Sequence, residues 1–216
     1  SITHVDELAA GFLFTQSIVS KRREILGSAF DQDNLEYRIE LDRNAIKRLA
    51  DFKKNQQTKG SSGGLMLQAA AAGRTGISAD MPMITPEQVL KLIHSHFEHS
   101  RLFQRTGAVH SAGIGTVDDI LFYFEDIGRH NALDKLAGKI LLDKIDPQQL
   151  VATVSCRMSL EIAGKIIKAG IPIVISNAAP TLSAVRLARE AGLTMIGFAR
   201  DNRFNIYTHD QRISAA

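Results

Sequence analysis

The stretch GIPIVISNAAPTLSAVRLAREAGLTMIGFAR, residues 170–200, decides the fold class of this chain. Its pattern predicts a strand over 171–176, a helix over 181–191 and a second strand over 193–199. The first strand is apolar at nearly every position, which is typical of a strand that is covered on both faces. Two such strands joined by a helix predict a parallel pair with the helix packed on one face of the sheet.

The same alternation of strands and helices continues on both sides of this stretch. Strands are expected over 120–126 and 150–155, and helices over 132–144 and 158–168. The segments AVHSAGI and ILFYFED flank GTVDD and predict a hairpin, and RFNIYTH predicts a final strand. We therefore expect an α/β domain over 81–216, with a mixed, largely parallel sheet flanked by helices.

Residues 1–80 do not show this regular alternation of strands and helices, and their pattern predicts a small N-terminal α+β part. Helical spacing over 5–19 begins almost at the first residue, so we expect further sequence before it. LEYRIEL alternates as a strand does, and RNAIKRLADFKKN predicts a basic amphipathic helix. A loop rich in Gly, Ser and Ala follows, and the next helix begins with a capping box of Thr85 and Gln88, with Pro86 in the first turn.

Composition narrows the class of protein. The 216 residues are 44% hydrophobic and 23% charged, which suits a globular protein with a core of its own. Lys and Arg exceed Asp and Glu by only 26 − 23 = 3, without a basic block, so a nucleic-acid partner is not expected. No apolar run approaches the roughly 18 residues of a membrane span. The single cysteine, Cys156, excludes an internal disulfide and fits a reducing, cytoplasmic setting.

Four polar clusters follow predicted strands, at 125–131, 155–159, 176–181 and 198–204. In open α/β sheets ligands bind outside the carboxyl ends of the strands, where helix N-termini favour phosphate. The clusters include four arginines, which suit bidentate phosphate contacts, so we expect an anion-binding edge. These arginines are Arg129, Arg157, Arg200 and Arg203.

Simpler structural interpretations stay open for these clusters. Asn131 could be an N-cap with Asp134 in the first helical turn, and Thr181 or Pro180 could open a helix. Asp201 and Asn202 could form a β-turn between two strands.

The histidines and the cysteine also have simple structural interpretations. His94, His96 and His99 do not share one helical face, so we expect a solvated helix and no metal site. Cys156 next to Arg157 at a helix start would favour a thiolate, whereas a free cysteine is commonly a small buried residue.

The motif EDIGRHNALDKLAG, residues 125–138, is highly specific. Together with GFLFTQSIV, RTGAVHSAG, the 170–200 stretch and RFNIYTH, in that order, it resembles the formate dehydrogenase accessory protein family (FdhD/NarQ). The resemblance runs from about residue 7 to 212. It implies a fold similar to cytidine deaminase and a cytoplasmic homodimer. Deamination itself is not expected, because H-x-E and P-C-x-x-C are both missing and one cysteine cannot complete that zinc site.

The resemblance also implies an activity. Family members bind molybdenum bis(molybdopterin guanine dinucleotide) and pass sulfur to it from a cysteine desulfurase, which formate dehydrogenase needs for activity. The family's cofactor contact maps here to Phe198, Ala199, Arg200, Asp201, Asn202 and Arg203. From the shared edge we infer that the corner after the strand 120–126 belongs to the same pocket, with Gly128, Arg129, His130 and Asn131.

The chain departs from the family pattern at the sulfur-carrying position. The family holds a persulfide on a loop cysteine, where this chain has TKGSSGGLML, with Ser61 or Ser62 in its place. Serine cannot form a persulfide. The leading hypothesis is a persulfide-type sulfurtransferase in which Cys156 substitutes or loop residues are missing. The alternative is a chaperone that holds the cofactor without moving sulfur, and an unrelated phosphate-ligand enzyme would use the same edge.

Overall fold

A six-stranded mixed sheet forms the centre of the chain, whose computed structural model describes residues 3–59 and 82–214. The middle strands β5, β6 and β7 are parallel, whereas the pairs β3–β4, β3–β5 and β7–β8 are antiparallel. In spatial order the strands are β4 (Ile120–Asp126), β3 (His110–Gly115), β5 (Val151–Val154), β6 (Ile173–Ser176), β7 (Thr194–Arg200) and β8 (Arg203–Thr208).

The mixed sheet is confirmed, but the expectation of a largely parallel one is wrong. Only the two pairings among β5, β6 and β7 are parallel. The reason lies in the connections, because the short links 116–119 and 201–202 are hairpins and cannot cross over a face of the sheet. The likeness to cytidine deaminase stays a prediction.

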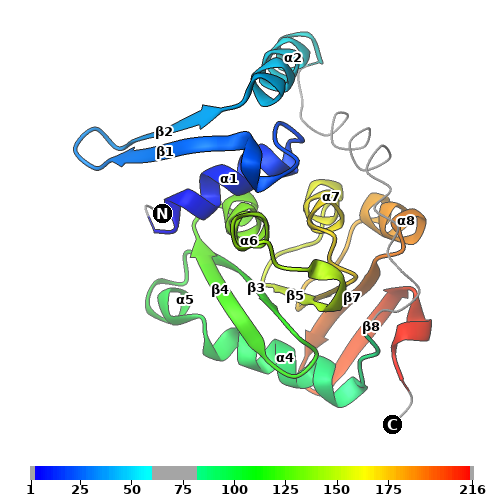
Figure 1. Cartoon of the computed structure of the whole chain (residues 1–216). Coiled ribbons are helices and arrows are strands. Elements are labelled where there is room, and N and C mark those ends of the chain that lie inside the picture. The colour runs from blue at the N-terminus through cyan, green and yellow to red at the C-terminus, as the bar shows by residue number, and fades with distance from the viewer. Residues whose placement is uncertain (1–2, 60–81, 215–216) are drawn as a thin grey trace.

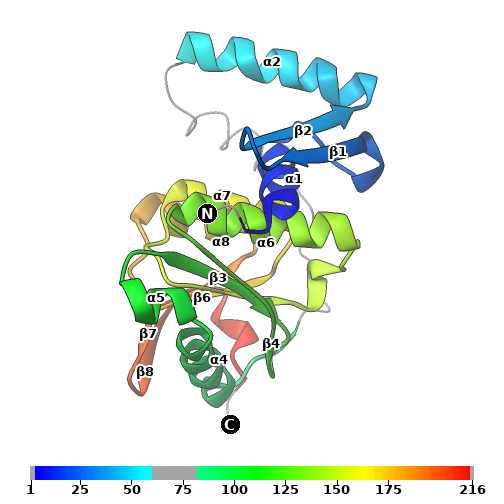
Figure 2. The same ribbon diagram turned by 90° about the vertical axis from the view of Figure 1, so that its left-hand side faces the viewer.

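Helices cover both faces of the sheet (Figures 1 and 2). Three lie on one face, α6 (Arg129–Asp143), α7 (Leu160–Ala169) and α8 (Leu182–Ala191). The opposite face carries α4 (Pro86–Glu98), whose predicted capping box is present, and α5 (Arg101–Thr106) follows it. Every residue of β5 and β6 is buried between these layers, as the apolar pattern of IPIVIS predicted.

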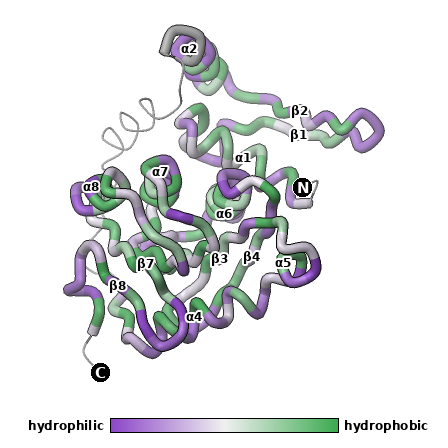
Figure 3. The backbone as a smooth tube through the Cα atoms, turned by 180° about the vertical axis from the view of Figure 1, so that it is seen from behind, coloured by the Kyte–Doolittle hydropathy of each residue, from purple (hydrophilic) through white to green (hydrophobic). Residues whose placement is uncertain are grey.

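The N-terminal part contains α1 (Val5–Thr15), the hairpin of β1 (Ile25–Asp31) and β2 (Glu36–Leu41), and α2 (Arg43–Lys59). The tip of the hairpin, residues 31–34, is hydrophilic (Figure 3). The predicted helix over 5–19 stops at residue 15, because the N–H groups of Ile18 and Val19 turn back to the carbonyl of Leu13. Short 3-10 helices span Arg22–Glu24, Pro147–Gln149 and Asp210–Arg212.

Helix α1 packs closely on α6, as Figure 2 shows. The two helices cross where Gly11 faces Gly138, and a Cβ on Gly11 would lie 1.7 Å from the carbonyl oxygen of Asp134. Backbones can approach this closely only where neither residue has a side chain. The predicted boundary near residue 80 lies outside the described residues. None of the helices in 3–59 and 82–214 has the length and hydropathy of a membrane span.

Candidate functional site

The carboxyl ends of the central strands meet at one edge of the sheet, and the predicted polar clusters lie side by side there. The N–H of Met158 donates to the carbonyl of Ala179 at 3.2 Å, and the N–H of Phe198 donates to the carbonyl of Ala178 at 3.2 Å. The loop after β6 is therefore joined by backbone hydrogen bonds to the loop after β5 and to the end of β7. We call this surface the strand-end rim, defined by residues 125–131, 155–159, 176–181 and 198–204.

The GRHN corner, residues 128–131, begins helix α6 at the rim. The helix starts at Arg129 with Gly128 as its N-cap, and no side chain caps it. Asn131 instead donates to Oδ1 of Asp126 at 3.1 Å. The interpretation of Asn131 as the N-cap is therefore wrong, because its amide is held by a carboxylate at the end of β4. The first-turn N–H groups of α6 consequently face the rim without a side-chain acceptor.

A buried ion pair anchors this corner to the sheet. Nζ of Lys135 lies 2.7 Å from Oδ2 of Asp126, and both side chains are at most 1% exposed. The N–H of Gly128 donates to the other carboxylate oxygen at 3.0 Å. Burial by itself raises the pKa of Asp126, but the hydrogen bonds from Lys135, Gly128 and Asn131 outweigh it and hold the pKa well below its ordinary value. This ion pair and the hydrogen bonds to Asp126 therefore fix the GRHN corner to the end of β4.

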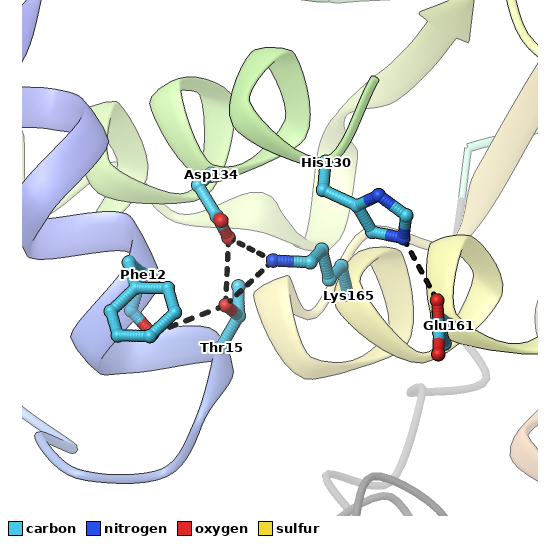
Figure 4. Close-up of polar contacts among 6 residues, drawn as sticks. All are labelled: Phe12, Thr15, His130, Asp134, Glu161 and Lys165. Atoms are coloured by element: carbon cyan, nitrogen blue, oxygen red, sulfur yellow. Dashed lines mark hydrogen bonds and ion pairs between the residues drawn. The ribbon is translucent and has the colours of Figure 1, made fainter. Parts of the chain in front are cut away.

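A second buried network joins three helices behind the rim (Figure 4). Lys165 of α7 forms an ion pair with Asp134 of α6, and Thr15 of α1 donates to the same carboxylate at 2.7 Å. Helix α6 starts at Arg129, so the interpretation of Asp134 as a residue of its first turn is wrong. Burial raises the pKa of Asp134, and the Lys165 ammonium opposes that rise. Nearby, His130 contacts Glu161 at 2.9 Å and ties the starts of α6 and α7 together.

The predicted β-turn between β7 and β8 is confirmed, with Asp201 in the left-handed region at φ 53°. Arg200, Asn202 and Arg203 are exposed around it, whereas Ala199 is fully buried and offers the rim only its backbone. Phe198 is also left-handed, at φ 51°. Left-handed backbone is unusual for a phenylalanine, and here it brings the N–H of this residue to the loop after β6.

Four arginines of the rim are exposed and form no ion pair within the described residues. They are Arg129, Arg157, Arg200 and Arg203. Arg129 lies close enough to His110 and Cys156 for its charge to lower the pKa of both. The rim therefore combines unpaired cations with an uncapped helix N-terminus, an arrangement suited to an anionic ligand.

The expectation that the histidines of α4 are solvated is wrong for His96. Its ring is fully buried and bonds Thr153 at 2.7 Å through Nδ1 and Ser111 at 2.8 Å through Nε2. Burial, with a smaller effect from His99, lowers the pKa of His96 to about 3. The sequence held the signal, because His96 continues the apolar positions Val89, Leu92 and Ile93 of this helix. The described residues contain no cluster of His, Cys, Asp or Glu that could hold a metal ion.

Comparison with known proteins assigns the chain to a family. The FdhD/NarQ family model matches residues 1–214. The chain belongs to this family. It is 37% identical to the sulfur carrier protein FdhD of Staphylococcus haemolyticus, over 100% of this chain and 82% of that protein. The FdhD protein of Bacillus pumilus is also 37% identical, over 98% of this chain and 81% of its own length.

A solved structure gives the same assignment. A crystal structure from Desulfotalea psychrophila, described as that of a formate dehydrogenase accessory protein, superposes with a TM-score of 0.77 at 25% identity. The match covers 99% of this chain and 81% of that one. The fold of this FdhD/NarQ member is therefore shared across the whole described chain, including the small N-terminal part.

The resemblance places the sulfur-carrying position at Ser61 or Ser62, and this expectation stays a prediction. Ser61 and Ser62 lie outside the described residues. Cys156 lies on the rim directly after β5, but it is only 4% exposed. Burial raises the pKa of its thiol to about 11, against the smaller lowering by Arg129. The expectation that a helix start and Arg157 favour a thiolate is therefore wrong, because desolvation of the anion dominates. The other interpretation, a small buried residue, is confirmed.

Proposed function

We propose that this chain acts as an FdhD-type sulfur carrier protein in the maturation of formate dehydrogenase, and that it binds molybdenum bis(molybdopterin guanine dinucleotide) at the strand-end rim. Two curated relatives that match nearly the whole chain bear the name sulfur carrier protein. The observation that carries the proposal is the set of exposed arginines without ion-pair partners in the described residues, gathered at the strand ends. The cofactor is a polyanion, and arginine forks match phosphate oxygens.

The rim offers two kinds of contact to the phosphates of this ligand. Arg200 and Arg203 are paired across the β7–β8 turn, so both guanidinium groups project from one short turn. The α6 N-terminus supplies backbone N–H groups, whereas Ser159 and Thr181 already cap α7 and α8. We therefore assign the phosphates to the β7–β8 turn and the GRHN corner, with Phe198–Arg203 and Gly128–Asn131 as the contacting residues.

The sulfur step requires a thiolate on this chain. The thiolate would attack the outer sulfur of a desulfurase persulfide, so that an S–S bond forms on the carrier while the desulfurase leaves as its own thiolate. Cys156 is the only cysteine of the sequence. Its place on the rim would put a persulfide beside the bound cofactor, but its burial and its raised pKa both oppose the attack.

These properties of Cys156 favour a second candidate function. In this alternative the chain holds the cofactor as a chaperone and carries no sulfur, which also agrees with a serine at the expected loop position. The two candidates share the anionic ligand and differ only in whether a persulfide forms. A cysteine desulfurase, formate dehydrogenase and a second copy of the chain are the proposed partners, and the cytoplasm is the proposed location.

Intact mass spectrometry after incubation with a cysteine desulfurase and cysteine separates the two candidates. A gain of one sulfur atom that is absent in Cys156→Ala assigns carriage to this residue. No gain in the wild type supports the chaperone. A titration with guanosine diphosphate tests the rim itself: the Arg200→Ala/Arg203→Ala double variant should bind at least tenfold more weakly. Unchanged binding would remove the turn from the cofactor site.

A further inference from the structure

A groove of about 450 Å³ separates helix α1 from the β1–β2 hairpin, and none of its lining residues belongs to the strand-end rim. Asp6 and Glu7 of α1 line one wall, and Tyr37 of the hairpin lines the other and donates its hydroxyl proton to Asp6. Arg22 also lines the groove, but its guanidinium donates to the carbonyl of Ile25 at 2.7 Å. The α1 wall of the groove is therefore acidic.

The acidic surface continues from this groove to the tip of the hairpin. Residues 31–36 carry three carboxylates and no cation, although Glu36 pairs with the exposed Arg38 at 2.9 Å. Two apolar side chains accompany the carboxylates, because Phe30 is 36% exposed and Leu35 is 65% exposed. A surface that combines acidic and apolar groups suits a partner with basic and apolar groups. We call this surface the acidic arm, defined by Asp6, Glu7 and residues 30–37.

The outer half of the hairpin has little support from its own chain. Within the described residues, β1 and β2 form a sheet of two strands, and such a sheet is marginally stable by itself. At its base, Ile25, Ile39 and Leu41 pack in the small core that α1 and α2 share. Phe30 and Leu35 lie beyond that core and are exposed. A contact from outside the chain would therefore stabilise this half of the hairpin.

Helix α2 carries a surface of the complementary kind. Its outer face is exposed and combines three cations with one large apolar side chain, which is 54% exposed. Spacings of three, four and seven residues place these side chains on one side of the helix. The cations form no ion pair within residues 3–59 and 82–214. We call this face the basic stripe, defined by Arg43, Ile46, Lys47, Ala50 and Lys53.

The acidic arm and the basic stripe belong to opposite sides of the hairpin. The groove lies between the hairpin and α1, whereas α2 lies on the other side of the hairpin (Figures 1 and 2). Ala45, Leu49 and Phe52 turn the inner face of α2 toward the shared core, so the basic stripe points away from the hairpin. One chain therefore cannot bring its own stripe to its own arm, but a second copy can.

We propose that two copies of the chain associate through these surfaces, with the basic stripe of each copy on the acidic arm of the other. A two-fold axis makes both contacts at once and closes the assembly at two copies. Lys47 and Lys53 then face carboxylates of the arm. Ile46 is covered by the exposed apolar side chains of the tip. This inference deepens the proposed function, in which a second copy is a partner, by assigning the surface of contact.

Sedimentation equilibrium of the full chain tests this contact with two charge reversals. Lys47→Glu/Lys53→Glu reverses the basic stripe, and Asp33→Lys/Glu36→Lys reverses the tip of the acidic arm. Each reversal is expected to weaken the dimer by about tenfold or more, because like charges then face each other in both contacts. Added salt should weaken the wild-type dimer, since the facing charges lie at the surface. Thermal melts check that the variants fold.

An equimolar mixture of the two reversed proteins is the sharpest test of a reciprocal contact. In a mixed pair, the acidic stripe of one protein meets its partner's basic surface, or the reverse, at both contacts, so the dimer should reappear. Neither variant can form such a pair with itself. Arg186→Glu/Arg189→Glu is the matched control, because it reverses two exposed cations on α8 and should leave the dimer unchanged.

The outcomes separate this inference from the proposed function. A wild-type dimer that both reversals break and that mixing restores assigns the contact to the arm and the stripe. A monomeric wild type, a dimer that survives either reversal, or folded variants that stay monomeric when mixed overturns the inference. Guanosine diphosphate titrations of the same proteins report on the rim alone. Failure of this nucleotide to bind would remove the rim assignment and leave the dimer contact standing.

Discussion

Replacing Gly138 by alanine tests the close crossing of α1 and α6 most directly. A Cβ at this position would lie 1.9 Å from the carbonyl oxygen of Glu7 in α1. Side-chain carbons essentially never come within 3.0 Å of such an atom, so α1 must move away by at least 3.0 − 1.9 = 1.1 Å. That shift would also pull Thr15 away from the Asp134 carboxylate behind the rim.

The magnitude follows from two opposed effects. Alanine in place of glycine within a helix favours folding by about 1 kcal/mol. Overpacking of a tight contact typically costs about 1–3 kcal/mol, and a rigid backbone carbonyl belongs at the upper end. We expect a net loss of about 1–2 kcal/mol of unfolding free energy, or a lowering of Tm by roughly 2–8 °C for a chain of this size.

Gly164→Ala is the matched control for this experiment. Gly164 also lies inside a helix, α7, but a Cβ there would have nothing within 4 Å. It should therefore show only the propensity gain, with an unfolding free energy up to about 1 kcal/mol higher than the wild type. Urea unfolding followed by circular dichroism measures both variants. A Gly138→Ala protein as stable as Gly164→Ala would refute the close approach of the two helices.

Three further predictions concern buried polar groups. Lys165→Met leaves the Asp134 carboxylate buried without its cation, and it should lower the unfolding free energy, measured by urea titration, by about 3–5 kcal/mol. Adding Asp134→Asn should recover part of this lost stability. A loss of less than about 0.5 kcal/mol in Lys165→Met would contradict the ion pair. His96 is neutral in the fold at a pKa of about 3, while an unfolded histidine titrates near 6.5, so the unfolded state binds more protons as the pH falls. Stability should therefore drop by about 2 kcal/mol between pH 7.5 and pH 5, and a His96→Gln variant with the same pH slope would show that another group is responsible. With a thiol pKa of about 11, native Cys156 should react with a disulfide reagent at pH 8 about a hundredfold more slowly than in urea, and equal rates would show that the thiol is accessible.

Local sequence patterns were sufficient for most elements of the fold. The strands and helices between residues 110 and 208 are those that periodicity predicts, and the capping box at Thr85 is present as expected. The start of α6 was misplaced because Asn131 has the side chain of a good N-cap, yet it bonds Asp126 instead. A cap preference describes one residue, whereas this hydrogen bond depends on where the preceding strand ends.

In the candidate site, too, some features could be predicted from local sequence and others depended on distant parts of the chain. The order of motifs was enough to name the family, and placing polar clusters after strands was enough to predict a common edge. The solvation of individual groups could not be predicted in this way. His96 and Cys156 have polar neighbours in the sequence, but both are buried by elements distant along the chain, and their pKa values follow that burial.

By itself, the sequence determined the α/β class, the family and the residues of the arginine turn, because periodicity and motif order are properties of neighbouring positions. Only the tertiary structure decided that three of the five strand pairings are antiparallel, that α1 and α6 touch through two glycines, and that Asp134 pairs with Lys165. It also showed that the Cys156 thiol is buried. These features depend on desolvation and close packing between segments far apart in the chain, and no local pattern encodes which surfaces will meet.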